Sequence, residues 1–512
     1  MTDQPPAEGG GRIRDAFGLT ALGFAFLHFL LGLLVFEPTL FPGGDNAGYL
    51  ILGEALRNGE GYRDLYLPGA PLHIRYPPLL PVMLAALGWI GNVLPAKFAM
   101  LICTAMTVWA TAHLGRRWVG DGPALAASGL LAVNPTLLEY GHYILSEAPF
   151  VLLIVAALWL SQRGDGRGAM LAMGAAVAAF ATRTAGMTVL IALPVAWLLA
   201  RRYRRAAWTT LVAIGVLASW ALYQSWASDQ PGYLSFLLLV DPYSPEAGTV
   251  SLAGLVGRGA ENTWAHVSRV LPGILLGPGE SSGAGRILLG LAVASAALWG
   301  WVRAARRRLG AAEVFTLLYA GLIALWPSVW TDQRFLLPLL PAILLLAFSA
   351  LWSFPLRASG LWLRPAVPVV LAIFGITWVM TVIPGRVACS ASYRAGRPCD
   401  VPASASLYAA ARWARENTSD DAVIANRKPR LFYWYSGRRG DVYPFSADAG
   451  TVLEGLDAMG ASYVVVDQVS GTTGRYLVPA IRSSPSRFEL VYQGGEPVTT
   501  ILRLRPASAE VE

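Results

Sequence analysis

The chain has 512 residues, of which 55% are hydrophobic and only 14% are charged, and its mean hydropathy is +0.48. Soluble proteins carry about 25% charged residues, so this composition excludes an ordinary soluble globule, and it equally excludes a disordered chain. Three cysteines exclude a disulfide-dense scaffold. The formal net charge of +8 would suit a nucleic-acid partner only if the basic residues formed one patch.

Long apolar runs dominate the first three quarters of the chain. A bilayer core of about 30 Å takes roughly 20 apolar residues per crossing helix. Eleven runs predict membrane spans. They are Ala16–Phe36, Ala96–Leu114, Ala124–Leu138, Ala148–Leu160, Gly168–Thr182, Ala185–Ala200, Ala206–Trp226, Ile287–Val302, Ala311–Trp330, Phe335–Phe354 and Pro365–Ile383. A further run, Pro77–Leu94, opens with three prolines and is ambiguous.

The basic clusters decide how this ambiguous run is interpreted. Short cytoplasmic loops hold an excess of Lys and Arg. If Pro77–Leu94 does not cross, every cluster falls on the cytoplasmic side, and if it crosses, all but the first fall outside. The clusters are Arg12/Arg14, Arg116/Arg117, Arg163/Arg167, Arg201/Arg202/Arg204/Arg205, Arg303/Arg306/Arg307/Arg308 and Arg357/Arg364. We therefore predict an interfacial or re-entrant segment at the outer leaflet, an internal N-terminus and an external C-terminus. Because the arginines stand at span ends, no nucleic-acid partner is expected.

The predicted organisation follows from this topology. Residues 1–15 form a cytoplasmic tail and residues 16–383 a membrane domain with external loops at 37–95 and 227–286, while residues 384–512 form an extracytoplasmic domain. The first span follows two arginines as a signal peptide would, but its length and the lack of a small-x-small site after it favour an uncleaved anchor. The expected location is the inner (cytoplasmic) membrane.

The tail alternates helix and strand patterns, which predicts a small α/β domain with a mostly parallel sheet. The expected helices are 406–418, 428–437 and 449–460, and the expected strands are 421–426 and 461–467. Cys389 and Cys399 stand just outside the last span, where an oxidising exterior would permit a disulfide. Two free thiols are the alternative.

Two carboxylates stand out on the predicted outer face. Asp45 follows two glycines and precedes an amphipathic helix with Tyr49 on its apolar face, and it is a candidate general base. The alternative for Asp45 is a helix N-cap. Glu147 begins a hydrophobic run, where desolvation of a carboxylate is costly unless something uses it. The alternative for Glu147 is an interface-level acid that caps the helix, with Ser146 as its N-cap.

Three arginines break the positive-inside pattern. Arg75, Arg183 and Arg334 each lie at the outer end of a hydrophobic segment, where guanidinium groups would suit a lipid phosphate. Snorkelling to ordinary head groups is the alternative. His73 is a candidate for binding phosphate or a metal. No phosphate loop, zincin motif or paired CxxC occurs.

Several segments taken together resemble the GT-C superfamily of membrane glycosyltransferases, and more closely glycosyltransferase family 39, with its protein O-mannosyltransferases and aminoarabinose transferases. The matching segments are GGDNAGY (43–49), RYPPLLP (75–81), NPTLLEYGHYILSEAP (134–149), TRTAG (182–186), RFLLPLLP (334–341) and NRKPRLFYWYSGRR (426–439). They cover most of the chain in order. Asn46 stands where many relatives have a second acid, and Arg75 with Tyr76 replaces the more usual His or Lys.

The resemblance implies an inverting transferase that uses a polyprenyl-phosphate-linked sugar and a hydroxyl on a lipid, glycan or protein. Asp45 would be the base and Glu147 the second acid. Arg75, Arg183 and Arg334 would surround the donor phosphate with His73. The candidates for substrate binding are Tyr49, Tyr76 and His142. No cofactor is certain, and a divalent metal is left open. A transporter or flippase of lipid-linked sugars is the alternative, with a non-catalytic sugar-lipid binding protein as a third reading.

Overall fold

The structure is a computed structural model of the chain, and two compact units divide its residues. The first, the helical unit, comprises Met1–Glu37, Lys97–Leu222 and Leu252–Val387. The second, the mixed unit, comprises Pro38–Ala96, Tyr223–Ser251 and Ala388–Glu512. The structure describes residues 9–87, 93–228, 233–244, 247–277, 283–355, 361–396 and 399–506. Residues 1–8 of the predicted tail, part of the Pro77–Leu94 run and Arg357 of the last basic cluster lie outside the described residues.

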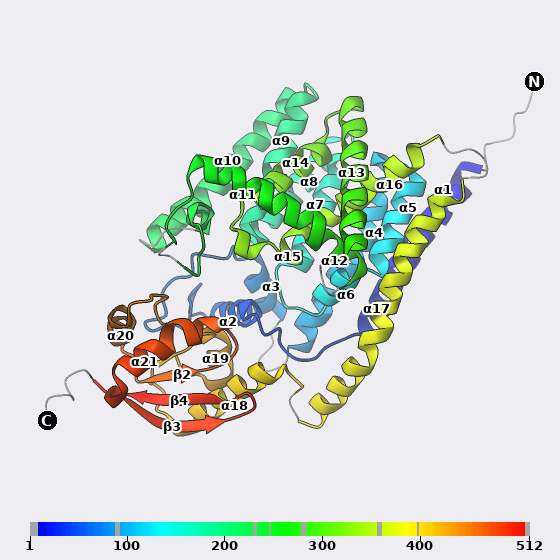
Figure 1. Ribbon diagram of the computed structural model, residues 1–512. Helices are drawn as coiled ribbons and strands as arrows, with labels where there is room; N and C mark the ends of the chain where they lie inside the picture. The colour runs from blue at the N-terminus through cyan, green and yellow to red at the C-terminus, as the bar shows by residue number, and fades with distance from the viewer. Residues whose placement is uncertain are drawn as a thin grey trace, which may run out of the picture. The chain divides into compact units, whose positions relative to one another are not determined.

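The predicted spans fall on helical segments (Figure 1). The helices are α1 (Gly9–Leu34), α4 (Leu94–Trp118), α5 (Asp121–Ala132), α6 (Pro135–Tyr140), α7 (Glu147–Ser161), α8 (Gly166–Thr182), α9 (Met187–Leu199), α10 (Tyr203–Ala227), α13 (Ala284–Arg307), α14 (Ala311–Leu325), α15 (Gln333–Leu336), α16 (Leu340–Ser353) and α17 (Leu363–Arg394). Six helical segments in the described residues are long and apolar enough to cross a membrane: 16–34, 94–118, 203–227, 284–307, 333–353 and 363–394. The chain is thus a multi-pass membrane protein, while the count of eleven spans stays a prediction.

One predicted span is broken in the structure. The run Ala124–Leu138 divides into α5 and α6 because Asn134 stands outside helical geometry and caps α6, its Oδ1 accepting the Leu137 N–H at 2.9 Å. Pro135 follows at the first helical position, where its missing N–H leaves no hydrogen bond unmade. The interruption at Asn134 and Pro135 also anchors α6, since the Asn134 amide donates to the Ile274 carbonyl at 2.8 Å.

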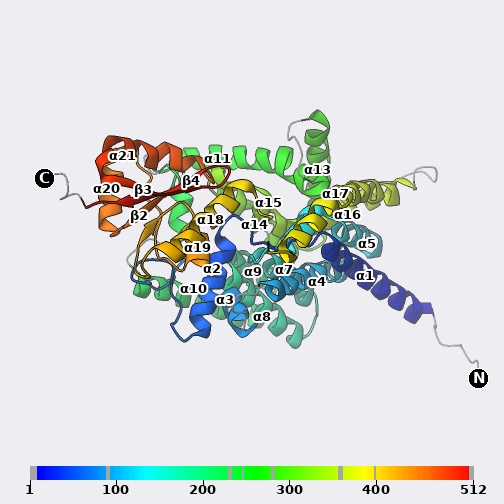
Figure 2. The same cartoon turned by 90° about the horizontal axis from the view of Figure 1, so that it is seen from below.

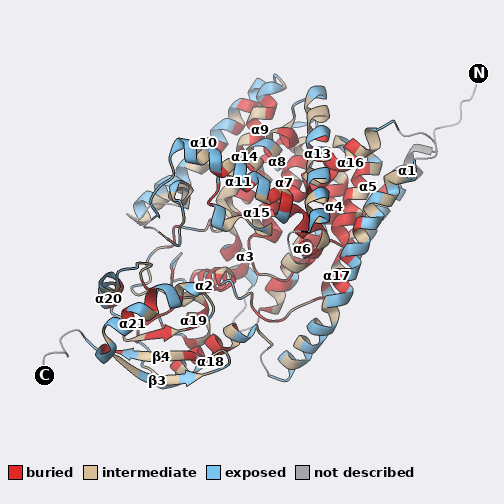
Figure 3. Cartoon of the chain, viewed as in Figure 1, coloured by how far each residue is buried: buried red, intermediate tan, exposed pale blue. Residues whose placement is uncertain are grey.

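Small residues let the helices of this unit pack closely. A Cβ at Gly300 of α13 would lie 2.1 Å from the Leu346 carbonyl oxygen of α16, and one at Gly290 would lie 1.9 Å from the Val267 carbonyl oxygen. Inside a bilayer, burial of apolar surface contributes little to the association of helices, and small residues at the contacts let the helices pack closely. Figure 3 shows the buried residues concentrated on α7, α8, α9 and α16, while α17 is largely exposed.

The predicted external loop 227–286 contains helices that its composition did not indicate. They are α11 (Leu252–Ala265), a π-helical turn at His266–Val270 and α12 (Leu271–Leu276), and all three belong to the helical unit. Asn262 fixes α11 against the end of α14, since its amide donates to the carbonyls of Ala324 and Trp326 at 2.8 and 2.7 Å.

The mixed unit is built on a four-stranded sheet of order β1-β2-β4-β3. The strands are β1 (Ile424–Ala425), β2 (Tyr463–Val466), β3 (Phe488–Gly494) and β4 (Thr499–Leu504). The helices of the tail are α18 (Pro402–Asn417), α19 (Pro429–Ser436), α20 (Ala449–Ala458) and α21 (Val478–Ser483). Val465 and Ile501 pack with α18 and α19 on one face, and Val464 and Leu502 pack with α20 and α21 on the other (Figure 2).

The expectation of a mostly parallel sheet is wrong. Only β1 and β2 pair in parallel, while β2 with β4 and β4 with β3 are antiparallel. The cause is the hairpin of β3 and β4, which the alternating helix and strand pattern did not reveal. A hairpin joins its strands through a short turn, and only antiparallel strands allow that. The three expected helices and two expected strands of the tail are confirmed.

Two shorter helices of the first predicted external loop complete the mixed unit. They are α2 (Asp45–Arg57) and α3 (Leu79–Leu87). At 1.5 Å per residue, the described residues of α3 extend about 13 Å, less than a bilayer core of about 30 Å. Cys389 and Cys399 form a disulfide with their Cα atoms 5.1 Å apart.

Candidate active site

The start of α2 places Asp45. Gly44 is the N-cap with a φ of 95°, a left-handed conformation that suits glycine, and Asp45 is the first helical residue. The alternative interpretation of Asp45 as the N-cap is therefore wrong. Its carboxylate still lies in the first turn, where the helix dipole favours negative charge, and its side chain contacts residues of other segments.

Those partners are a tyrosine and an arginine. The Tyr76 hydroxyl donates to Asp45 Oδ1 at 2.8 Å, and Arg430 Nη1 donates to the same oxygen at 3.1 Å. Arg430 Nη1 also contacts the Tyr76 hydroxyl at 2.6 Å, which closes the triangle. The Asp45 side chain is 26% exposed and that of Arg430 15%. Asp45 is thus held in one orientation while part of its carboxylate faces solvent.

Arg430 reaches Asp45 because Gly48, which follows Asp45 by about one turn of α2, has no side chain. A Cβ at Gly48 would lie 2.9 Å from Arg430 Cδ, so glycine leaves the groove in which the arginine runs. The Arg430 guanidinium also lies over the rings of Tyr66 and Tyr76, at 5.5 and 5.2 Å from their centroids. Arg430 is the second residue of α19, so the tail completes the surroundings of Asp45.

His73 supports Tyr76 from behind. Its Nδ1 lies 2.9 Å from both carboxylate oxygens of Asp64, and its Nε2 accepts the Tyr76 backbone N–H at 2.7 Å. Burial lowers the pKa of His73 more than the Asp64 carboxylate raises it, so the ring is neutral with its proton on Nδ1. Both ring nitrogens are engaged, and neither is available to a phosphate or a metal in this arrangement.

The other predicted residues of this region have different surroundings. Tyr49 packs against Tyr76 with ring centroids 4.7 Å apart. Arg75 is exposed. Burial raises the pKa of the Asp441 carboxyl, and the positive charge of Arg75 offsets part of that rise. Burial and the neighbouring Arg427 lower the pKa of Lys428. The carboxylate Asp45 therefore lies in a region rich in guanidinium and phenol groups.

A second cluster lies in the helical unit around Glu147. This first residue of α7 is fully buried, and its Oε1 accepts hydrogen bonds from Arg183 Nη1 and Arg334 Nε. Arg183 also donates to the Ser146 hydroxyl at 3.1 Å. Ser146 occupies the N-cap position but its side chain makes no capping bond. Glu147 Oε2 has no hydrogen-bond partner among the described residues.

The two arginines are placed by helix ends and aromatic rings. Arg183 ends α8, and its guanidinium lies 5.7 and 6.0 Å from the ring centroids of Phe150 and Phe335. Arg334 lies in the one-turn helix α15, whose N-cap Asp332 accepts the Arg334 N–H at 2.8 Å. Their side chains are 15% and 21% exposed, against none for Glu147. The Glu147 carboxylate thus contacts both guanidinium groups, and Asp332 is a second acid that interacts electrostatically with Arg334.

His142 does not join the Glu147 contacts that the structure describes. It is 1% exposed and packs edge-on against Phe36, while its carbonyl accepts the Lys97 ammonium at 2.9 Å. Burial lowers the pKa of His142 to about 3, and neither ring nitrogen has a hydrogen-bond partner in the described residues. The ring is therefore neutral and buried.

Sequence reasoning missed Arg430 and Asp64. Arg430 lies 385 positions from Asp45, and although its segment NRKPR was part of the family resemblance, no role was assigned to it. Asp64 stands nine residues before His73 in an irregular loop, and no periodic pattern relates the two. No group of three or more His, Cys, Asp or Glu suited to a metal occurs within the described ranges.

No family model matches the chain, and no curated protein matches it significantly in sequence. Its structure is more informative. A chain with this helical unit and this small sheet has the fold of the GT-C membrane glycosyltransferases, so the resemblance seen in the sequence is confirmed at the level of the fold.

Two solved structures illustrate the likeness. One is the archaeal oligosaccharyltransferase AglB from Archaeoglobus fulgidus, in complex with an inhibitory peptide and a dolichol-phosphate (TM-score 0.56, 14% identity, covering 87% of this chain and 69% of that chain). The other is ArnT from Cupriavidus metallidurans bound to undecaprenyl phosphate (TM-score 0.55, 14% identity, covering 97% of this chain and 98% of that chain). The second match therefore extends over nearly the full length of both chains.

Proposed function

We propose that this protein is an inverting glycosyltransferase that moves a sugar from a polyprenyl-phosphate-linked donor to an acceptor hydroxyl at the outer face of the cytoplasmic membrane. The acceptor class is a lipid, glycan or protein. The observation that carries the proposal is Asp45, a partly exposed carboxylate held by Tyr76 and Arg430 in a chain with this fold. Two solved neighbours hold lipid phosphates, which supports the donor class.

The chemistry assigns a role to each group. The acceptor oxygen forms a bond to the anomeric carbon as the bond from that carbon to the phosphate oxygen breaks, and the phosphate leaves with the electron pair. Asp45 takes the hydroxyl proton, a contribution that typically accelerates such a reaction 10²–10⁴-fold, an order-of-magnitude range. Tyr76 and Arg430 orient that carboxylate, and Tyr49 packs behind Tyr76.

The leaving phosphate requires positive charge. Arg183 and Arg334 supply it, because guanidinium groups stay charged and bind phosphate through paired hydrogen bonds. Arg75 is proposed as a third phosphate ligand. Glu147 is fully buried behind the two arginines, so we assign it a positioning role in place of direct contact with substrate. His73 positions Tyr76. The domain organisation with an extracytoplasmic region at 384–512 is part of the same proposal.

The test is transfer by the purified protein supplied with a panel of labelled polyprenyl-phosphate sugars. We expect Asp45→Asn to abolish transfer while expression and membrane insertion stay normal. Glu60→Gln, an exposed acid just after α2, is the matched control and keeps full activity. Near-normal transfer by Asp45→Asn rejects Asp45 as the base. Movement of intact donor across a vesicle membrane without transfer would instead support the flippase alternative.

A further inference from the structure

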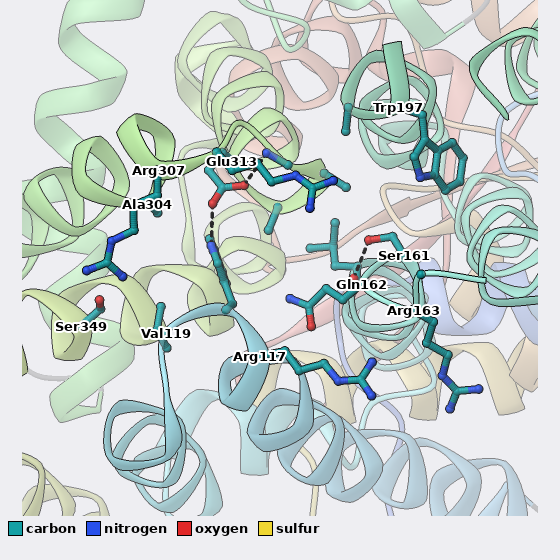
Figure 4. Close-up of a pocket in the computed structure, with 18 of the residues that line it drawn as sticks. Arg117, Val119, Ser161, Gln162, Arg163, Trp197, Ala304, Arg307, Glu313 and Ser349 are labelled. Carbon is teal, nitrogen blue, oxygen red and sulfur yellow. Dashed lines mark hydrogen bonds between the residues drawn. The ribbon is translucent and has the colours of Figure 1, made fainter. Parts of the chain in front are cut away.

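A cavity at one end of the helical unit lies among residues that the proposed reaction does not use (Figure 4). Its volume is about 320 Å³, and the ends of α4, α7, α13 and α14 contribute to its walls. Six arginines from four separate basic clusters line it: Arg117, Arg163, Arg202, Arg303, Arg307 and Arg308. These clusters are the ones that the positive-inside pattern assigns to the cytoplasmic side.

The positive charge of this cavity is not neutralised by its lining. Glu313 is the single acidic residue among the lining residues that the structure describes. Its Oε1 accepts the Trp118 indole N–H at 2.6 Å and its Oε2 accepts the Gly310 N–H at 2.9 Å, both neutral donors. None of the six arginines forms an ion pair with a carboxylate of the described residues. Like charges gathered around one cavity repel each other unless an anion enters.

The rest of the lining suits a lipid head group. Trp118, Trp197 and Leu158 also line the cavity, and indole rings favour the boundary between bilayer core and water. Figure 4 shows the Gln162 side chain reaching toward the open centre. Its Oε1 is buried and has no hydrogen-bond partner in the part of the chain that the structure describes. An unused acceptor beside an anion site fits a ligand that carries both a phosphate and a hydroxyl group.

We propose that this cavity binds the glycerol-phosphate head group of an anionic phospholipid from the leaflet that faces these arginines. The phosphate lies among the guanidinium groups and a glycerol hydroxyl donates to Gln162 Oε1. An ammonium head group would meet the arginines instead and is disfavoured. Basic pockets between membrane helices on the cytoplasmic side are known to bind anionic head groups. The bound lipid joins the ends of α4, α7, α13 and α14, and this role is independent of the proposed transfer reaction.

The test compares two charge-matched double variants. Arg303→Gln/Arg307→Gln removes two arginines of the cavity. Arg204→Gln/Arg306→Gln removes two exposed arginines from the same clusters that do not line it. Phosphatidylglycerol or phosphatidylcholine is titrated into the purified full-length protein in neutral detergent, and binding is counted by native mass spectrometry. Each basic group near an anionic lipid contributes roughly a fivefold factor, so we expect about 30-fold weaker phosphatidylglycerol binding in the first variant and little change in the second.

Three further outcomes decide the matter, and the first two use the wild-type protein alone. The wild type must prefer phosphatidylglycerol over phosphatidylcholine, and equal binding of the two overturns the proposal. Inorganic phosphate and glycerol phosphate are added as competitors, and displacement of the lipid at equal concentration would assign the cavity to a soluble phosphate compound. Equal weakening in both double variants would show a general surface attraction and would also overturn it.

Discussion

Glu147 illustrates how burial changes the role of a residue that sequence reasoning treated as a second catalytic acid. Its side chain is fully buried, while Arg183 and Arg334, which contact it, keep 15% and 21% of their side-chain surface exposed. A ligand therefore meets the guanidinium groups first. A carboxylate in contact with two guanidinium groups fixes their direction, and the exposed surface of the two arginines remains accessible to an anion.

This arrangement predicts a large stability effect at Glu147. Glu147→Gln leaves Arg183 and Arg334 without their counter-charge, and breaking one side of a buried ion pair lowers the free energy of unfolding by about 3–5 kcal/mol. Glu139→Gln is the control, because the Glu139 carboxylate accepts a neutral hydrogen bond, from the Tyr143 hydroxyl at 2.7 Å, and we expect a loss of about 1 kcal/mol there. Thermal midpoints of the purified variants measure both. Equal midpoints for Glu147→Gln and the wild type would contradict the role as counter-charge.

His73 provides a prediction about pH. Burial lowers its pKa below the ordinary value of about 6.5. Between the folded and the unfolded pKa, the unfolded state binds more protons, so the stability due to this residue is complete above about pH 6.5 and declines as the pH falls toward the folded pKa. A histidine NMR titration, with His73→Asn to identify the signal, should give a midpoint below 6.5. A midpoint at or above that value would contradict the buried neutral ring.

At the scale of elements, the packing of α19 against α2 determines the geometry of Asp45. Gly48→Ala adds a methyl group 2.9 Å from Arg430 Cδ, so the arginine must move away from Asp45. Alanine also raises helix propensity by about 1 kcal/mol relative to glycine. We therefore expect α2 to become no less stable while kcat falls by up to about 100-fold, the cost that a displacement of about 1 Å can have.

A double-mutant cycle separates this effect from simple damage. Arg430→Gln should lower kcat with little change in KM, and Gly48→Ala/Arg430→Gln should be no worse than Arg430→Gln alone. Arg439→Gln, an exposed arginine nine residues further on, is the charge-matched control. Additive losses in the double variant would show that Gly48 acts through something other than Arg430.

Local sequence patterns predicted most of the helices and strands. They could not predict contacts between residues that are far apart in the sequence. Apolar runs indicated the membrane helices because the bilayer sets their length, and amphipathic periodicity indicated α18. The hairpin β3–β4 was missed because β3 has no alternation of buried and exposed residues, with Leu490 56% exposed. The contact of Asp45 with Arg430 joins residues 385 positions apart, and no single-sequence periodicity encodes it. Asp45, Glu147, Arg183 and Arg334 were found because each stands at a helix boundary.

At the scale of the whole molecule, the charge distribution predicts the orientation of the chain in the membrane. An odd number of spans with the basic clusters inside leaves the C-terminal region outside. The oxidised pair Cys389 and Cys399 agrees with an external position, because disulfides persist in oxidising compartments. The only other cysteine, Cys103, is a free thiol within α4.

This orientation predicts a labelling pattern for the three cysteines. Sealed spheroplasts are treated with a membrane-impermeant reductant and then with an impermeant maleimide. We expect labelling only after reduction, because Cys389 and Cys399 form a disulfide. We expect no labelling in Cys389→Ser/Cys399→Ser, because the remaining Cys103 lies within a predicted span. Protease added outside should then remove the region beyond α17, and permeabilised cells serve as the control for both reagents. Labelling that requires permeabilisation would place the tail in the cytoplasm, and the span count and the outer-face site would both have to be abandoned.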